Sequence, residues 1–395
     1  RLSRDRSRVR VPSLPPKLNI VMKKLKNIII LYPSFDSGGV ATNLVNFINY
    51  SLKKKINIYL ISDLKKNNQK QKFQKNINFI NIKTNPNILI QKRFITSFFS
   101  MFTLYKTFKK LDKNNSIILS FQSHILPIII CRMFSRKIII RNSEDILEAT
   151  KYADNKISAY FVLMLKFFLY NLSNGIITNS NKSKKSLQSI LFDKKKIKLI
   201  FNPCINKVLK NKKNAKDKLI LSVGRLCKQK NQELLIKAFP LFLKKFPKYK
   251  LILVGHGYDK IRLKKLCKYL NIENKVFFYG QTLNPKKFYK KAKLLVLPSL
   301  YEGLPNVLIE AVNNSLPCIS TNCSGSDDIL TKKYGTFISM HNYSSLAKKM
   351  IFSLNSYNKM LMNNKKIKLN LNRFLINPQA SKYLAYSDNI LNNNS

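Results

Sequence analysis

Residues 293–321 read KLLVLPSLYEGLPNVLIEAVNNSLPCIST and contain one complete unit of a pattern that recurs along the chain. An apolar run at 293–299 predicts a buried strand, residues 304–313 have the spacing of an amphipathic helix, and 317–321 form a second short apolar run. Apolar strands that alternate with helices are typical of a parallel sheet covered on both faces. The unit therefore predicts an α/β fold.

The alternation occurs in two series on either side of residues 202–218, which lack apolar periodicity, are rich in lysine and are predicted to be a solvated connector. Strands are predicted at 27–32, 56–62, 77–82, 116–121, 137–142, 175–178, 197–201, 219–224, 249–255, 275–280, 293–299 and 317–321. Helices are predicted at 42–53, 95–111, 159–172, 183–191, 232–246, 258–270, 285–292, 304–313 and 343–354. Two doubly wound domains in tandem are the simplest interpretation, with a ligand site shared at the carboxyl ends of their strands.

The composition excludes several classes of protein. The 395 residues include 73 Lys+Arg and 18 Asp+Glu, for a net charge of +55, yet 45% are hydrophobic, so the chain is not a disordered polycation. Six scattered cysteines and three histidines favour a reduced, cytoplasmic protein without a structural zinc site. No apolar run reaches the roughly 18 residues that a membrane-spanning helix needs.

Residues 1–21 differ in composition from the rest of the chain. Five of the 12 arginines fall within Arg1–Arg10. We interpret 1–21 as a disordered leader that is not native sequence, with Met22 as the natural start; a basic arm for nucleic acid or membrane is the alternative.

Acidic residues are scarce, so the position of each one is informative. Glu302 lies in the turn after a buried strand, and Glu310 follows eight residues later on the apolar face of a helix. Eight helical residues rise about 12 Å, comparable with the span from a sugar to a ribose across a diphosphate. Gly303 would let a ligand approach the backbone, and free amides at the helix start favour phosphate. An ordinary helix start with an acidic first turn explains Glu302 but not a buried Glu310.

Two basic residues follow the first strand of the second series. Arg225 is one of only seven arginines beyond the leader and stands at a strand end, where its two-pronged guanidinium suits a phosphate. Lys230 by itself is typical of a solvated surface lysine.

From Leu219 to about Ile338 the chain resembles the nucleotide-sugar-binding half of retaining glycosyltransferases of family 4, which have the two-domain GT-B architecture. The matching elements are, in order, SVGRLCKQKN, KLILVGHG, VFFYG, LLVLPSLYEGLPNVLIEA, LPCISTNCSG and KYGTFI. Several ordered motifs are more specific than any one of them. The loop CSGSDDIL (323–330) lacks both prolines of the family's usual Pro-Ser-Gly-Pro, which leaves the donor sugar open.

The resemblance implies a role for each matching residue. Arg225 and Lys230 would neutralise the donor diphosphate, Glu302 would contact the transferred sugar, and Glu310 would hold the ribose hydroxyls. The backbone would cap sugar and phosphate at Gly303, Leu304, Pro305 and Asn306.

The first series resembles the family more loosely. Gly38 and Gly39 would form the tight turn that approaches the donor phosphate from the opposite side. His124, past the fourth strand, is predicted to be catalytic and acceptor-facing, although a lone histidine is more often structural. Glu144, at the end of the next strand, is the second acceptor-side candidate.

The resemblance also implies domain boundaries and a reaction. Residues 22–201 would be the acceptor-side domain, 202–218 the linker, 219–375 the nucleotide-sugar-binding domain and 376–395 a C-terminal helix that crosses back. The chain would transfer a hexose or N-acetylhexosamine, UDP-linked, to a hydroxyl of an envelope glycan, with retention. No metal and no cofactor other than the donor substrate is expected, because no Asp-x-Asp motif occurs. A basic nucleic-acid-binding protein and a catalytically silent sugar-nucleotide binder are the alternatives.

The expected partners are a nucleotide sugar and a glycan or polyprenyl-diphosphate-linked acceptor of bacterial polysaccharide or lipopolysaccharide synthesis, with no specific nucleic acid. Residues 95–111 combine aromatic residues with lysines and would suit an anionic membrane surface at the cytoplasmic side. Equally, 95–111 and the similar segment 158–172 would suit buried helices of the first domain.

Overall fold

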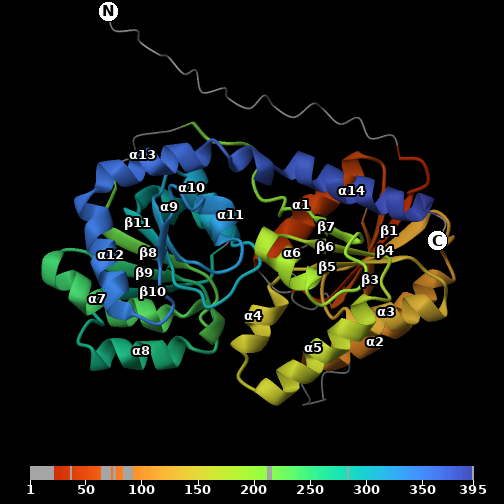
Figure 1. Cartoon of the computed structure of the whole chain (residues 1–395), viewed down its shortest axis with the longest axis horizontal. Coiled ribbons are helices and arrows are strands. Elements are labelled where there is room, and N and C mark those ends of the chain that lie inside the picture. The colour runs from red at the N-terminus through yellow and green to blue at the C-terminus, as the bar shows by residue number, and fades with distance from the viewer. Residues whose placement is uncertain are drawn as a thin grey trace, which may run out of the picture.

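The computed structural model describes residues 22–35, 38–63, 73, 77–82, 92–210, 216–282 and 284–393. The predicted leader, 1–21, lies outside the described residues. Figure 1 shows two lobes, each with a sheet between helices, and a pair of helices, α13 and α14, that runs from one lobe to the other. Two parallel, doubly wound sheets confirm the predicted α/β class.

The described part of the first lobe contains a seven-stranded parallel sheet in the order β3-β2-β1-β4-β5-β6-β7. Its strands are β1 (Asn27–Ser34), β2 (Asn57–Asp63), β3 (Asn78–Asn81), β4 (Ser116–Ser120), β5 (Ile138–Asn142), β6 (Gly175–Thr178) and β7 (Ile197–Leu199). The helices are α1 (Gly39–Lys53), α2 (Lys92–Phe108), α3 (Ile125–Met133), α4 (Ile146–Lys151), α5 (Lys156–Tyr170) and α6 (Asn181–Gln188).

The second lobe has, within the residues described, a six-stranded parallel sheet in the order β10-β9-β8-β11-β12-β13. Its strands are β8 (Leu219–Val223), β9 (Lys250–Val254), β10 (Val276–Gly280), β11 (Leu294–Leu297), β12 (Cys318–Thr321) and β13 (Thr336–Ile338). Its helices, with those that close the chain, are η2 (Lys228–Lys230), α7 (Gln232–Lys245), α8 (Lys260–Tyr269), α9 (Lys286–Lys291), α10 (Asn306–Asn313), α11 (Ser326–Leu330), α12 (Tyr343–Asn355), α13 (Tyr357–Lys368), η3 (Leu371–Phe374) and α14 (Ile376–Asn392).

Strand β1 shows why the apolar runs form central strands. Ile28 and Ile30 pack into one core with α1 and α14, whereas Ile29 and Leu31 pack into the opposite core with α2 and α3. Successive side chains of a strand point to opposite faces, so a strand buried on both faces needs an unbroken apolar run. All twelve predicted strands are found to within two residues; β13 and the helices α3, α4, α11 and α13 were not predicted.

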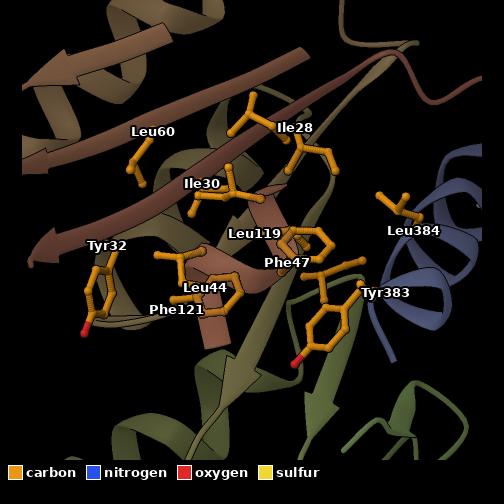
Figure 2. Close-up of a cluster of buried hydrophobic side chains, with 14 of the residues drawn as sticks. Ile28, Ile30, Tyr32, Leu44, Phe47, Leu60, Leu119, Phe121, Tyr383 and Leu384 are labelled. Atoms are coloured by element: carbon orange, nitrogen blue, oxygen red, sulfur yellow. The ribbon is translucent and has the colours of Figure 1, made fainter. Parts of the chain in front are cut away.

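Helix α14 is part of the first lobe's core although it ends the chain. The ring of Tyr383 lies 5.2 Å from that of Phe47 and stacks at 6.5 Å on Phe121, and Leu384 is fully buried beside them (Figure 2). The first lobe is therefore completed by residues that follow the second lobe in sequence.

The chain passes between the lobes twice, and the two passages are hydrogen-bonded to each other. The amide of Ile205 donates to the carbonyl of Phe374 at 3.2 Å, and the amide of Ile376 donates to the carbonyl of Ile205 at 2.9 Å. Asn202 and Ile205 are buried, so the prediction of a solvated connector is wrong at its N-terminal end. The prediction failed there because the many lysines of 202–218 outweigh the few residues of that segment that are buried.

No helix in the described ranges is long and apolar enough to cross a membrane.

Tyr383 offers a test of the docking of α14. Its hydroxyl accepts a 2.8 Å hydrogen bond from Nε of the fully buried Arg141. Tyr383→Phe leaves that donor unsatisfied, so we expect a loss of about 1–3 kcal/mol in the free energy of unfolding, measured by urea denaturation. Tyr269→Phe, at an exposed tyrosine on α8, is the matched control. Equal stability of the two variants would contradict the assigned role.

Candidate functional site

Each sheet reverses its strand order at one point, and the predicted site residues follow the strands that flank those points. In the first sheet β1 and β4 are neighbours, and the chain beyond them leads to Gly38 and to His124. In the second sheet β8 and β11 are neighbours, and Arg225 and Glu302 follow them. Ligands of open α/β sheets bind outside the carboxyl ends of the strands at such a switch point.

Lys230 and Glu302 form an ion pair at the switch point of the second sheet. Their Nζ and Oε1 atoms are 2.5 Å apart, and the hydroxyl of Ser299 donates to the same oxygen at 2.7 Å. The side chains are only 15% and 9% exposed. The stem of Lys230 lies against Gly224, where a Cβ would come within 3.4 Å of it. Lys230 is therefore a positioned cation rather than the solvated lysine that its surroundings in the sequence suggest.

Arg225 lies on the surface next to this pair. Its guanidinium donates to Oε1 of Gln229 at 3.1 Å, and Gln229 donates in turn to the carbonyl of Tyr301 at 3.1 Å. Gln229 thus ties Arg225 to the turn that carries Glu302. Among the described residues no carboxylate pairs with Arg225, which leaves its charge available for an anion.

Glu310 projects from α10 toward α9. Its Oε2 accepts a 2.8 Å hydrogen bond from the hydroxyl of Tyr289. Desolvation raises the pKa of Glu310, and this effect outweighs the opposing hydrogen bond from Tyr289 and the charge of Lys286. Within the described residues its other oxygen, Oε1, makes no hydrogen bond. A partly exposed carboxylate with one oxygen held and one open suits a ligand that brings hydroxyl donors.

The turn between the two glutamates packs against the first lobe. The amide of Asp145 donates to the carbonyl of Glu302 at 3.2 Å, and a Cβ on Gly303 would come within 1.9 Å of the carbonyl oxygen of Ser143. Glycine was expected here to let a ligand approach. The structure gives a different reason, because the backbone of the other lobe occupies that position.

The side chain of Asn306, the first residue of α10, is hydrogen-bonded at the same contact between the lobes. Its amide donates to Oδ1 of Asn43 at 2.9 Å, and its own Oδ1 accepts from Asn202 at 2.7 Å. Leu304 and Pro305 are buried beside it. Only backbone groups of this turn remain for the predicted capping of sugar and phosphate, and that role stays a prediction.

Gly38 and Gly39 form the start of α1 on the opposite side. No described atom lies within 4 Å of a Cβ built on Gly38, and a Cβ on Gly39 would make ordinary contact, 3.5 Å, with the amide of Asn306. Packing within the described chain therefore does not require glycine at Gly38. The donor contact predicted for Gly38 stays a prediction.

His124 contacts two uncharged side chains, those of Ser120 and Tyr170. The imidazole Nδ1 of His124 lies 2.9 Å from the hydroxyl of Ser120, and the ring packs edge-on against Tyr170 at 6.0 Å. Burial, with the nearby charges of Lys166 and Arg141, lowers the pKa of His124 to about 3, so the ring is neutral at physiological pH.

The carboxylate of Glu144 lies close to the donor-side turn. Burial and then the charge of Glu144 raise the pKa of Tyr301 to about 12, and the same two effects raise the pKa of Tyr170. Glu144 therefore lies near both the ring that contacts His124 and the residue that precedes Glu302, and its acceptor-side role stays a prediction.

Several contributors were missed in the sequence. Tyr289 lies in the lysine-rich segment KKFYKK, which carries no sign of a partner 21 residues away. Tyr152 of the first lobe stacks on Tyr301 at 6.3 Å and its hydroxyl lies 3.4 Å from the sulfur of Met340. Such pairs depend on how the lobes meet, which no local pattern encodes.

In the described part of the chain no three His, Cys, Asp or Glu side chains are grouped as metal ligands would be.

Residues 206–369 match the family model described as glycosyl transferases group 1. The chain is 30% identical over 262 residues to the N-acetylgalactosamine-N,N'-diacetylbacillosaminyl-diphospho-undecaprenol 4-alpha-N-acetylgalactosaminyltransferase of Campylobacter jejuni, with 64% of this chain and 71% of that protein covered. It is 34% identical over 226 residues to an uncharacterized glycosyltransferase of Methanocaldococcus jannaschii, with 52% and 54% covered. The chain thus spans about half the length of that relative.

Among solved structures, the chain is similar to a mutant of TarM from S. aureus in complex with fondaparinux, alpha-GlcNAc-glycerol and UDP. The TM-score is 0.74 at 16% identity, with 93% of this chain and all of that chain covered. At this identity the likeness concerns the fold alone.

Gly303→Ala tests the close approach of the two lobes. A methyl group 1.9 Å from the carbonyl of Ser143 cannot be accommodated without moving backbone, so we expect a fall of several degrees in Tm by calorimetry. Gly38→Ala is the matched control for stability, because its methyl group would have no described atom within 4 Å and its φ of −174° suits alanine. If both variants melt like the wild type, the contact does not constrain the lobes.

Glu310→Gln tests the desolvation of that carboxyl. The pKa of Glu310 is higher in the folded than in the unfolded chain, so its contribution to stability is full below the unfolded pKa and is lost as pH rises through the folded one. Glutamine still accepts from Tyr289 and never ionises. We expect the variant to melt at or above the wild-type temperature at about pH 8, and the difference to shrink toward about pH 4. A variant that is less stable at pH 8 would show that the carboxylate is not penalised by burial.

Proposed function

Since the chain belongs to the glycosyl transferases group 1 family and has the GT-B fold, we propose that it transfers a sugar from a nucleotide-diphosphate donor to a hydroxyl group of an envelope glycan or lipid-linked oligosaccharide. The donor class that we propose is a UDP-linked hexose or N-acetylhexosamine. The C. jejuni relative is named for transfer of N-acetylgalactosamine onto a diphospho-undecaprenol-linked sugar, and the TarM structure contains UDP.

One observation carries the proposal: a held cation, Lys230, and an unpaired one, Arg225, lie together where β8 and β11 end. Departure of a nucleoside diphosphate leaves negative charge on phosphate oxygens. Fixed positive groups aimed at that charge lower the barrier, because they need no reorganisation during the reaction. Two cations at a switch point match the charge of the leaving group.

Glu302 would act through Lys230 as well as on the sugar. An ammonium group has three donors, and Glu302 uses one of them, so Lys230 can bind a phosphate oxygen without losing its partner. Ser299 holds the same carboxylate oxygen, which fixes the orientation of the pair. The second oxygen of Glu302 remains for a hydroxyl of the transferred sugar.

The ribose and the diphosphate of the donor would be held by residues of the second and the first lobe, respectively. Glu310 would accept a ribose hydroxyl at Oε1, while Tyr289 keeps Oε2 in place. Gly38 and Gly39, at the first turn of α1, would present backbone amides to the diphosphate from the other lobe.

We further propose a retaining, metal-independent mechanism. The incoming hydroxyl would approach on the face that the leaving phosphate occupies and give its proton to a phosphate oxygen, so that no protein nucleophile is needed. His124 would act as a neutral hydrogen-bonding group toward the acceptor rather than as a cation, because its pKa lies near 3. Glu144 would orient the acceptor hydroxyl.

We propose that the acceptor belongs to bacterial polysaccharide or lipopolysaccharide synthesis at the cytoplasmic face of the membrane. A polyprenyl-diphosphate-linked acceptor is the class named for the C. jejuni relative. The surface that would hold the protein there is argued below.

A donor screen tests the proposal. Thermal shift and donor hydrolysis with UDP-glucose, UDP-galactose and their N-acetylated forms should identify at least one stabilising donor. Lys230→Met should lower kcat/KM for hydrolysis at least about 100-fold, because it removes a fixed charge from the leaving group. Glu310→Gln should weaken nucleotide binding with little loss of stability.

Lys228→Met is the matched control. Lys228 lies two residues away, is half exposed and, among the described residues, pairs with the exposed Asp154 alone, so its loss should change kcat/KM less than about threefold. Binding of no nucleotide sugar, or equal effects of the two lysine variants, would reject the site assignment.

A further inference from the structure

The first lobe exposes an apolar surface that its own fold does not use. We call it the aromatic face and define it by six exposed side chains on three helices: Phe98, Phe102, Met133, Ile157, Phe161 and Phe168. Their exposed fractions run from 56% to 85%. Single exposed apolar residues are common, but a group of this kind on neighbouring helices marks an interaction site.

Helix α5 contributes half of the six side chains of this surface and little of the core. Of its 15 residues only Tyr170 is buried. Ile157, Phe161, Met164 and Phe168 follow one another at spacings of four, three and four residues, so they form a single stripe on the outer side. The sequence interpretation of 158–172 as a buried helix is therefore wrong for this stripe, which faces solvent, whereas Leu163 and Leu169 pack against the core.

The three helices present their outer sides in the same direction. Met101 of α2, Ile128 of α3 and Tyr170 of α5 all pack into one core on the same face of the first sheet. Helix α3 packs against both α2 and α5, and Figure 1 shows the three together at the lower right. Residues on the sides opposite that core must point away from the sheet together.

The three helices that form this surface carry charge of one sign. Helices α2, α3 and α5 contain no Asp or Glu, and exposed cations stand among the aromatic residues: Lys106, Arg132 and Lys156. Nζ of Lys106 lies 4.9 Å from the ring centroid of Phe102. Aromatic side chains beside cations match the boundary of an anionic bilayer, where rings enter the acyl region and ammonium groups meet phosphates.

We propose that the aromatic face binds an anionic phospholipid membrane. A second copy of the chain fits less well, since two such faces would bring cations together with no carboxylate on these helices to compensate them. The charge complementarity thus selects a lipid surface.

The position of α5 links this surface to the site. Asp154, just before the Asn155 that caps α5, forms an ion pair with Lys228 of the second lobe, two residues from Lys230. The apolar stripe therefore begins beside the junction where the site lies. A membrane bound to the aromatic face would present a lipid-linked acceptor near that junction, and this part of the inference rests on the proposed function.

Flotation of the full chain with vesicles tests the proposal without donor or acceptor. We expect binding to phosphatidylcholine vesicles containing about 30% phosphatidylglycerol, weaker binding at high salt, and little binding to phosphatidylcholine alone. The triple variant Ile157→Gln, Phe161→Gln and Phe168→Gln should lower the partition coefficient at least about tenfold, because three exposed apolar groups no longer enter the bilayer. Donor hydrolysis and Tm should stay at wild-type values, which shows that the variant is folded.

The double variant Ile261→Gln and Tyr269→Gln is the matched control. Both residues are at least 71% exposed but lie on α8 of the second lobe, so vesicle binding should be unchanged. Failure of the wild type to float, equal binding to neutral vesicles, or equal flotation of the triple variant would overturn the proposal. So would a lipid-free dimer, seen by size-exclusion chromatography, that the triple variant abolishes. Loss of vesicle binding with intact donor hydrolysis separates this surface from the proposed transfer site.

Discussion

A buried arginine holds together the point where both lobes, the connector and the last helix meet. Arg141, at the end of β5, is 2% exposed and has no carboxylate partner among the described residues. Its guanidinium donates to the hydroxyl of Tyr383 at 2.8 Å, to Oδ1 of Asn202 at 2.6 Å and to the hydroxyl of Ser143. A buried charge is costly unless its donors are satisfied, so this arginine requires three separate segments to stay in place.

The site depends on that junction through shared residues. Asn202 accepts from Arg141 and donates to Asn306, which in turn donates to Asn43 at the start of the first lobe. Ser143 lies two residues beyond Arg141 and makes the close approach to Gly303. The turn that carries Glu302 is therefore positioned by the first lobe as much as by β11, although every predicted donor contact except Gly38 and Gly39 comes from the second.

The net charge of +55 explains less than its size suggests. The described lysines are spread over helices, turns and connectors of both lobes, where a single lysine identifies no site. One basic residue and one group of basic residues gain meaning only from their surroundings. Lys230 does so because a carboxylate holds it. The cations of the aromatic face do so because apolar side chains surround them and acidic residues are missing from those helices. The few carboxylates were the better guide, since a buried Glu302 or a half-buried Glu310 needs a partner.

Local sequence patterns were enough to predict the two parallel sheets and every described strand except β13, because a buried strand leaves an apolar run in the sequence. They also placed Arg225, Lys230, Glu302 and Glu310 after particular strands, because ligands of such sheets bind at strand ends. Only the folded chain shows the pairing of Lys230 with Glu302 and of Tyr289 with Glu310, since these partners are 72 and 21 residues apart. The same holds for the packing of Gly303 against Ser143 and for the outward direction of the apolar side of α5. An amphipathic pattern shows that a helix has an apolar side, but the packing of its neighbours settles whether that side meets the core or the surroundings.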